Sequence, residues 1–151
     1  MTHPLVHARN TPDKIAYMMA ETGHGITYRQ LEDRSNQGAQ LFRSLGIKRG
    51  DHMAVLLENS TTFMEIAWAA QRSGVYFTPI SRYLTGEEIA YIVKDCGAKI
   101  FVTSPQCHDK VANLLDTELK GVKLFMIGGV KPGFESWEAA IAKQPAERIK
   151  D

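Results

Sequence analysis

Histidine and cysteine are the residues of this 151-residue sequence whose side chains most readily bind metals or act as nucleophiles. His3 and His7 stand four positions apart, a spacing that would place both imidazoles on one helix face, where they could bind a metal ion. No third ligand is near them in the sequence, and chain ends rarely hold a rigid metal site. We therefore interpret both as surface histidines and predict no metal-binding residue.

Cys107 and His108 could form a nucleophile and its base, but they are adjacent in the sequence. On a helix, neighbouring side chains point about a hundred degrees apart, so these two cannot form a simple dyad. Cys96 and Cys107 are too few for a disulfide framework and lack CxxC spacing, so we expect two reduced thiols. No Gly-x-Ser-x-Gly elbow is present. We predict no catalytic residue, and an enzyme that uses Cys107 remains the weaker hypothesis.

Phosphate binding would require a glycine-rich loop at the start of a helix. The segment 128–133, GGVKPG, follows a predicted strand and carries a lysine, but its spacing matches neither GxxxxGK[ST] nor GxGxxG. We interpret it as a flexible surface turn. Glu87 and Glu88 stand at a predicted helix start, where negative charge complements the helix dipole. Trp68, among alanines, is interpreted as packing. The sequence predicts no cofactor-binding residue.

The composition is that of an ordinary globular domain. Apolar residues make up 44% and charged residues 23%, and the formal net charge is +1, from 18 basic and 17 acidic residues spread along the chain. The absence of any block of like charge disfavours nucleic acid and anionic membranes as partners. Neither a signal peptide nor a membrane-spanning apolar run is visible. We predict a cytoplasmic chain with residues 1–151 in one α/β unit.

The first part of the chain predicts a short helix and a hairpin ahead of a long helix. Residues 5–10 favour the short helix, 14–20 a strand, and the glycines at 23 and 25 a tight turn into a second strand through Ile26. Thr27 and Gln30 form a capping-box pattern. The helix that it opens ends at Gly46.

From residue 53 the sequence alternates between strand and helix patterns. A near-continuous apolar run at residues 53–57 predicts a buried parallel strand. Further strands are expected at 75–80, which Pro79 ends or places at its margin, at 99–103 and at 122–127. Helices are expected from Asn59 or Ser60 to Gly74, from the capping box at 85–88 to Gly97, from 104–105 to about Leu115, and over 137–143. Such alternation predicts a doubly wound α/β fold with a mainly parallel sheet, flanking helices and a small amino-terminal hairpin.

An ordered series of motifs resembles the adenylate-forming superfamily, which includes acyl-CoA synthetases, luciferases and peptide-synthetase adenylation domains. Each motif alone is weak, but the order and spacing match from about His7 to Thr103. The segments that carry the resemblance are ITYRQL (26–31), GIKRGD (46–51), VLLENS (55–60), AAQRSGVYFTPI (69–80), TGEEI (85–89) and AKIFVT (98–103).

The resemblance implies that the chain is a partial amino-terminal subdomain of an acyl-CoA synthetase. Such an enzyme activates a carboxylic acid, here expected to be a fatty acid, with ATP and Mg²⁺, and transfers the acyl group to CoA. The family's Ser/Thr/Gly-rich phosphate loop would be expected shortly after Asp151, so no family catalytic residue can be placed on this sequence. In some relatives, basic residues near the loop after the 98–103 strand approach CoA phosphates. Lys110 is the only nearby candidate, and a solvated helix lysine is the favoured interpretation.

Two hypotheses from different classes therefore follow. The first is a piece of an acid–CoA ligase, inactive alone, that binds none of the cofactors and self-associates through apolar surface left bare. The alternative is a self-contained α/β binding or interaction module without catalysis. In the first case the open reading frame would continue into a Ser/Thr/Gly-rich loop that carries a lysine. In the second, a ligand would raise the melting temperature of a compact monomer.

Overall fold

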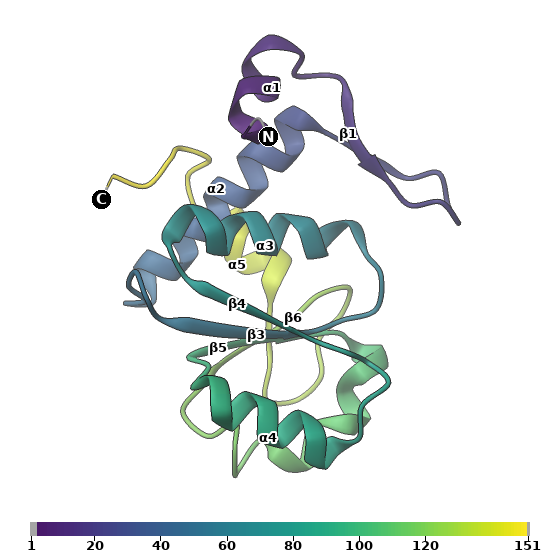
Figure 1. Ribbon diagram of the computed structural model, residues 1–151, viewed down its shortest axis with the longest axis vertical. Coiled ribbons are helices and arrows are strands. Elements are labelled where there is room, and N and C mark those ends of the chain that lie inside the picture. Colours follow the sequence, from purple (N-terminus) through teal and green to yellow (C-terminus); the bar gives the residue numbers. More distant parts are fainter. Residues whose placement is uncertain (1–2, 151) are drawn as a thin grey trace.

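The computed structural model describes residues 3–150 and shows a five-stranded parallel sheet with helices on both faces and a small hairpin packed against one of the helical layers (Figure 1). The hairpin pairs β1 and β2 in antiparallel fashion, and the sheet has the strand order β4-β3-β5-β6-β7. The strands are β1 (Ile15–Met18), β2 (Gly25–Thr27), β3 (His52–Leu56), β4 (Tyr76–Ile80), β5 (Ile100–Thr103), β6 (Lys123–Met126) and β7 (Glu135–Ser136). The predicted α/β fold with its amino-terminal hairpin is confirmed.

Helices on the two faces of the sheet come from different parts of the chain. Figure 1 shows α2, α3 and α5 over one face, and α4 with the 3-10 turns over the other. The helices are α1 (Pro4–Asn10), α2 (Tyr28–Ser44), α3 (Thr61–Ser73), α4 (Gly86–Cys96) and α5 (Trp137–Ala142), with 3-10 helices η1 (Pro105–Lys110) and η2 (Ala112–Leu114). Because right-handed crossovers run in opposite directions from β3 to β4 and from β4 to β5, α3 and α4 must lie on opposite faces.

Strand β3 shows how one apolar run serves both faces. Met53 and Val55 belong to the core under α2, α3 and α5, whereas Ala54 and Leu56 belong to the core under α4. Successive side chains of a strand point to opposite faces, so a strand at the centre of a two-sided sheet must be apolar throughout. This explains the uninterrupted run that predicted a buried parallel strand.

The predicted helix starts at two capping boxes are confirmed. The Thr27 hydroxyl accepts a hydrogen bond from the Gln30 N–H at 3.2 Å, and the Gln30 amide oxygen accepts one from the Thr27 N–H at 2.9 Å. Thr85 and Glu88 repeat the arrangement at α4. Helix α3 ends on Gly74 with φ of +65°, a left-handed conformation that glycine adopts without strain.

Residues 104–115 differ from the single helix that the sequence predicts. They form two short 3-10 helices, and their backbone hydrogen bonds join residues three apart, such as Leu114 N–H to the Val111 carbonyl at 2.9 Å. At Val111 the backbone leaves the helical region with φ of −125°. This β-branched side chain is fully buried, so its packing against the α4-side core decides the local backbone over helix propensity.

Strand β7 is absent from the prediction because Glu135 and Ser136 carry no apolar pattern. They pair with Phe125 and Met126 of β6 and lead directly into α5. The Trp137 side chain that follows is fully buried beside Phe42 and Phe125. Burial of this indole fixes the edge of the sheet, which a two-residue pattern in the sequence cannot indicate.

Candidate functional site

The strand order places a topological switch point between β3 and β5. The chain moves from β3 to β4 on one side and then crosses to β5 on the other side of β3. In open α/β sheets, ligands bind in the crevice outside the carboxyl ends of the strands at such a point. The residues that follow β3 and β5 are therefore the first place to look for a site.

A cluster around Glu58 ties the ends of these two strands together. The Ser104 hydroxyl donates to Glu58 Oε2 at 2.6 Å, and Cys107 Sγ lies 3.7 Å from the same oxygen. Thr103 Oγ1 donates to the Leu56 carbonyl at 2.9 Å. The cluster was not predicted from the sequence. Its only signal was that Glu58 and Ser104 each follow a strand shortly after it ends.

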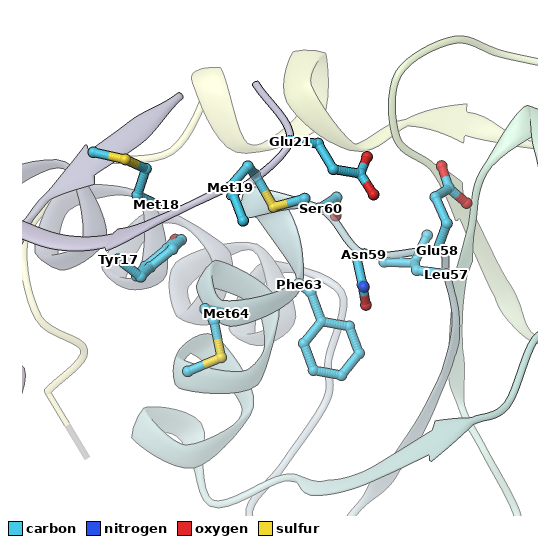
Figure 2. A pocket seen from close by; sticks show the side chains of 11 residues that line it. Tyr17, Met18, Met19, Glu21, Leu57, Glu58, Asn59, Ser60, Phe63 and Met64 are labelled. Carbon is cyan, nitrogen blue, oxygen red and sulfur yellow. The ribbon is translucent and has the colours of Figure 1, made fainter. Parts of the chain in front are cut away.

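Beside Glu58 lies an open crevice of about 480 Å³ between the hairpin and the start of α3 (Figure 2). The Tyr17 hydroxyl of β1 crosses it to donate to the Thr61 carbonyl at 2.8 Å, which holds the hairpin against α3. Figure 2 shows the side chains that form the wall, with methionines from both elements. The lining residues are Tyr17, Met18, Met19, Ala20, Glu21, Leu57, Glu58, Asn59, Ser60, Phe63 and Met64.

The electrostatics of this crevice do not suit a phosphate. Its lining contains two carboxylates, Glu21 and Glu58, and no lysine, arginine or histidine. A polyphosphate needs cations or converging N–H donors, so carboxylates here would repel it. Burial raises the pKa of Tyr17, with Glu65 adding to the effect, so the phenol stays protonated. The crevice fits an apolar group better than an anion.

Cys107 and His108 do not form a catalytic pair. Cys107 is buried, and this burial raises the pKa of its thiol, which disfavours the reactive thiolate. The His108 ring instead packs edge-on against Phe134, with Nδ1 3.4 Å from Asp109 Oδ1. The two side chains point to different surroundings, as their adjacency in the sequence predicts.

His3 and His7 each contact a different aromatic ring. His3 Nδ1 accepts a hydrogen bond from the Leu5 N–H at 3.1 Å, which caps α1, and its ring meets Trp68 edge-on. His7 stacks on Tyr28 at 4.7 Å between ring centroids. Among residues 3–150, no three histidine, cysteine or acidic side chains are grouped as metal ligands.

The two remaining candidates for anion binding already have partners. Lys110 Nζ donates to the Leu84 carbonyl at 2.9 Å, so this lysine joins η1 to the loop before α4. In the glycine-rich turn at 128–133, the Gly128 N–H donates to Glu138 Oε1 at 2.8 Å. A carboxylate thus takes the position that a phosphate would need. The turn is exposed, in line with its interpretation as a surface turn.

Comparison with known proteins decides the family. A family model described as AMP-binding enzyme matches residues 6–148, nearly the whole chain. The chain belongs to the AMP-binding enzyme family. The resemblance that rests on the motifs between residues 26 and 103 is therefore confirmed. No helix in the described part of this family member is long and apolar enough to cross a membrane.

The curated relatives of this AMP-binding chain include CoA ligases. A crotonobetaine/carnitine–CoA ligase of Proteus mirabilis is 33% identical over 110 residues, which cover 65% of this chain and 21% of that protein. The long-chain-fatty-acid–CoA ligase FadD13 of Mycobacterium tuberculosis is 32% identical over 92 residues, or 61% of this chain and 18% of that protein. The chain thus spans about a fifth of the length of the curated relatives it matches.

Solved structures of CoA ligases share the fold of this AMP-binding chain. The anthranilate CoA ligase AuaEII superimposes with a TM-score of 0.84 at 22% identity, over 95% of this chain and 28% of that one. A benzoate CoA ligase from Burkholderia xenovorans gives 0.79 at 19% identity, over 96% and 29%. At these identities the likeness shows the fold alone.

Proposed function

We propose that this chain is the amino-terminal subdomain of an ATP-dependent acid–CoA ligase. The observation that carries the proposal is the family match over residues 6–148 in a chain whose curated relatives include CoA ligases, of which the matched segments cover about a fifth. The whole enzyme would join a carboxylic acid to AMP, with Mg²⁺ on the phosphates, and then pass the acyl group to CoA. Residues 1–151 would form one α/β unit of that cytoplasmic enzyme.

A fatty acid is the substrate that we propose for the whole enzyme. Two relatives support it by name, FadD13 and the rat long-chain fatty acid transport protein 2, which is 29% identical over 125 residues. The apolar crevice beside β3 is compatible with an acyl chain near this subdomain. The carnitine-type relative makes a small polar acid the competing outcome of a substrate screen.

The chain by itself would be a scaffold without ligase activity. Stabilising a transferring phosphate-bearing group requires a preorganised cradle of N–H donors, cations and Mg²⁺. The crevice between the hairpin and α3 instead presents Glu21 and Glu58, and both Lys110 and the Gly128 N–H are already bonded within the protein. No catalytic step is assigned to these residues. Exposed Met18 and Met64 on the crevice wall support a tendency of the isolated chain to self-associate.

The test compares the 151-residue chain with the protein encoded by its complete gene. We expect pyrophosphate release and acyl-CoA formation from the gene product with ATP, Mg²⁺, CoA and palmitate, and none from the chain alone. Decanoate, benzoate and crotonobetaine in parallel reactions identify the acid class. Turnover by the chain alone would refute the scaffold role, and a gene that stops at codon 151 would refute the parent enzyme.

A further inference from the structure

Three side-chain amides on α2 hold residues 144–147, close to the carboxyl-terminal end of the described chain. All three donate to backbone carbonyls more than a hundred positions away, and Figure 1 shows the carboxyl-terminal segment leaving the fold beside α2. The bonds run from Gln37 Nε2 to the Gln144 carbonyl at 3.1 Å, from Asn36 Nδ2 to the Ala146 carbonyl at 3.0 Å, and from Gln40 Nε2 to the Glu147 carbonyl at 2.9 Å.

The acceptors in this contact are backbone atoms only. A side-chain amide that donates to a backbone carbonyl depends on where the backbone runs. It does not depend on which side chain stands at that position. We propose that Asn36, Gln37 and Gln40 form an amide clamp, a surface on α2 that binds the backbone of a segment without helix or strand and fixes where residues 144–147 leave the subdomain. Its occupant is this segment of the same chain.

A buried ion pair between Glu32 of α2 and Arg72 of α3 orients Asn36, one of the three clamp residues. Asn36 is 3% exposed, and its Oδ1 accepts from Arg72 Nη1 at 3.1 Å. Its Nδ2 also donates to Glu32 Oε1 at 3.2 Å. Because Arg72 is a donor only, the amide oxygen must face it and the NH₂ group must face the tail. The α2–α3 interface thereby sets the direction of the exit.

Apart from the half-buried Gln144, the side chains of the segment are exposed. Pro145, Glu147 and Arg148 are exposed, and the carbonyl groups are what the clamp contacts. The clamp therefore predicts that substitutions in the segment leave its path unchanged, whereas substitutions on α2 release it. This inference depends on contacts within the chain and holds whether or not the whole protein is a ligase.

The experiment measures ¹⁵N relaxation of the 151-residue chain in solution. In Gln37→Glu/Gln40→Glu, carboxylate oxygens of the same size replace the donors and face carbonyl oxygens. We expect the order parameter of the Glu147 N–H to fall from about 0.85, typical of rigid backbone, to below about 0.6. Adding Asn36→Asp should release Ala146 as well. If the triple variant fails to fold because Asn36 belongs to the buried network, the double variant still decides.

Two controls separate the clamp from its alternatives. Gln71→Glu adds one negative charge by the same substitution on the exposed surface of α3 and should leave the order parameters unchanged. Glu147→Ala/Arg148→Ala removes segment side chains and should also change nothing. A wild-type value for Glu147 already below about 0.6, or a loss of order in the segment variant equal to that in the α2 variant, would overturn the proposal.

Discussion

The two helical layers that cover the sheet are held by different interactions: one by apolar packing, the other by apolar packing and a buried ion pair. Under α4 and the 3-10 turns, the core is an apolar cluster that includes Ile89, Val93 and Phe101. Under α2 and α3 there is an equally buried apolar cluster, but the two helices also share an ion pair between Arg72 and Glu32 whose side chains are only 3% and 11% exposed. Apolar packing alone suffices to hold a helix on this sheet, so the buried charges need another reason.

The geometry indicates that the buried charges fix the register of α3 along α2. The Arg72 guanidinium donates to both carboxylate oxygens of Glu32, to Ser35 Oγ at 2.9 Å and to Asn36 Oδ1 at 3.1 Å. These acceptors lie on one face of α2 at spacings of three and four residues, so a slip of α3 by one turn would leave a buried charge unpaired. The α4 layer has no comparable penalty among its described contacts.

The largest expected effect is the loss of one partner of this pair. Glu32→Ala leaves the Arg72 charge buried and uncompensated, so we expect the free energy of unfolding to fall by about 3–5 kcal/mol. Urea unfolding monitored by tryptophan fluorescence measures the change. On the other face, Thr85→Ala removes only a helix cap, and we expect a loss of about 1 kcal/mol.

A double replacement sharpens the contrast between stability and register. Glu32→Leu/Arg72→Met fills the same space with apolar groups, and we expect most of the lost free energy to return. Backbone amide spectra of α3 should then show more than one packing arrangement if the pair specifies register. A double variant as unstable as Glu32→Ala would mean that the charges stabilise the interface outright, and the comparison between the layers would fail.

The parallel layer was predictable because its signals are local. The central strands β3 and β5 are largely apolar and buried, and the capping residues Thr27 and Thr85 precede their helices directly. The buried ion pair was not predictable, because Glu32 and Arg72 each occupy an ordinary polar position of a helical pattern. Only the approach of α2 to α3, forty residues apart in the sequence, brings them together.

The same reason limits what the sequence says about the candidate site. Glu58 and Ser104 follow different strands, and their contact requires that β5 pair with β3 rather than with β4. A strand order is decided by packing of the whole layer, which no local pattern contains. The split of residues 104–115 into two 3-10 helices likewise depends on where Val111 is buried.

The second expected effect concerns how closely α2 approaches α3. A Cβ built on Gly38 would lie 2.7 Å from the Ala69 Cβ and 3.3 Å from the Trp137 ring, closer than van der Waals contact allows. Gly38→Ala should therefore destabilise the protein by about 1–3 kcal/mol through overpacking, despite the better helix propensity of alanine. Adding Ala69→Gly returns space at the contact, and we expect a favourable coupling energy in the double-mutant cycle. If the losses in free energy of unfolding of the two single variants simply add, the two helices can move apart to make room. That result would contradict a layer whose register is fixed.

The smallest expected effect is on the pH dependence of the free energy of unfolding. It comes from the second ion pair of the α2–α3 layer, in which Arg34 and Glu65 lie 2.7 Å apart. Burial raises the pKa of Glu65 above its ordinary value of 4.5, although the bond to Arg34 opposes the shift. The native state therefore binds a proton more tightly than the unfolded state. The contribution of Glu65 to the free energy of unfolding is therefore most favourable below pH 4.5, and it falls as pH rises through the raised pKa. Asp51 has the opposite sign: the Lys99 hydrogen bond lowers its pKa, so its contribution is lost on acidification.

Glu65→Gln tests this sign because the amide is neutral at every pH. As pH rises from about 4 to about 8, we expect the urea midpoint of the variant to increase relative to the midpoint of the wild type. Loss of the partner of Arg34 would add an offset without a slope, because that guanidinium stays charged and its side chain is 41% exposed. A constant difference between the two midpoints would mean that Arg34 fully compensates the burial of Glu65. Burial of the Glu65 charge would then not lower the free energy of unfolding. The Arg72–Glu32 pair would be the one feature in this comparison that distinguishes the α2–α3 layer from the α4 layer.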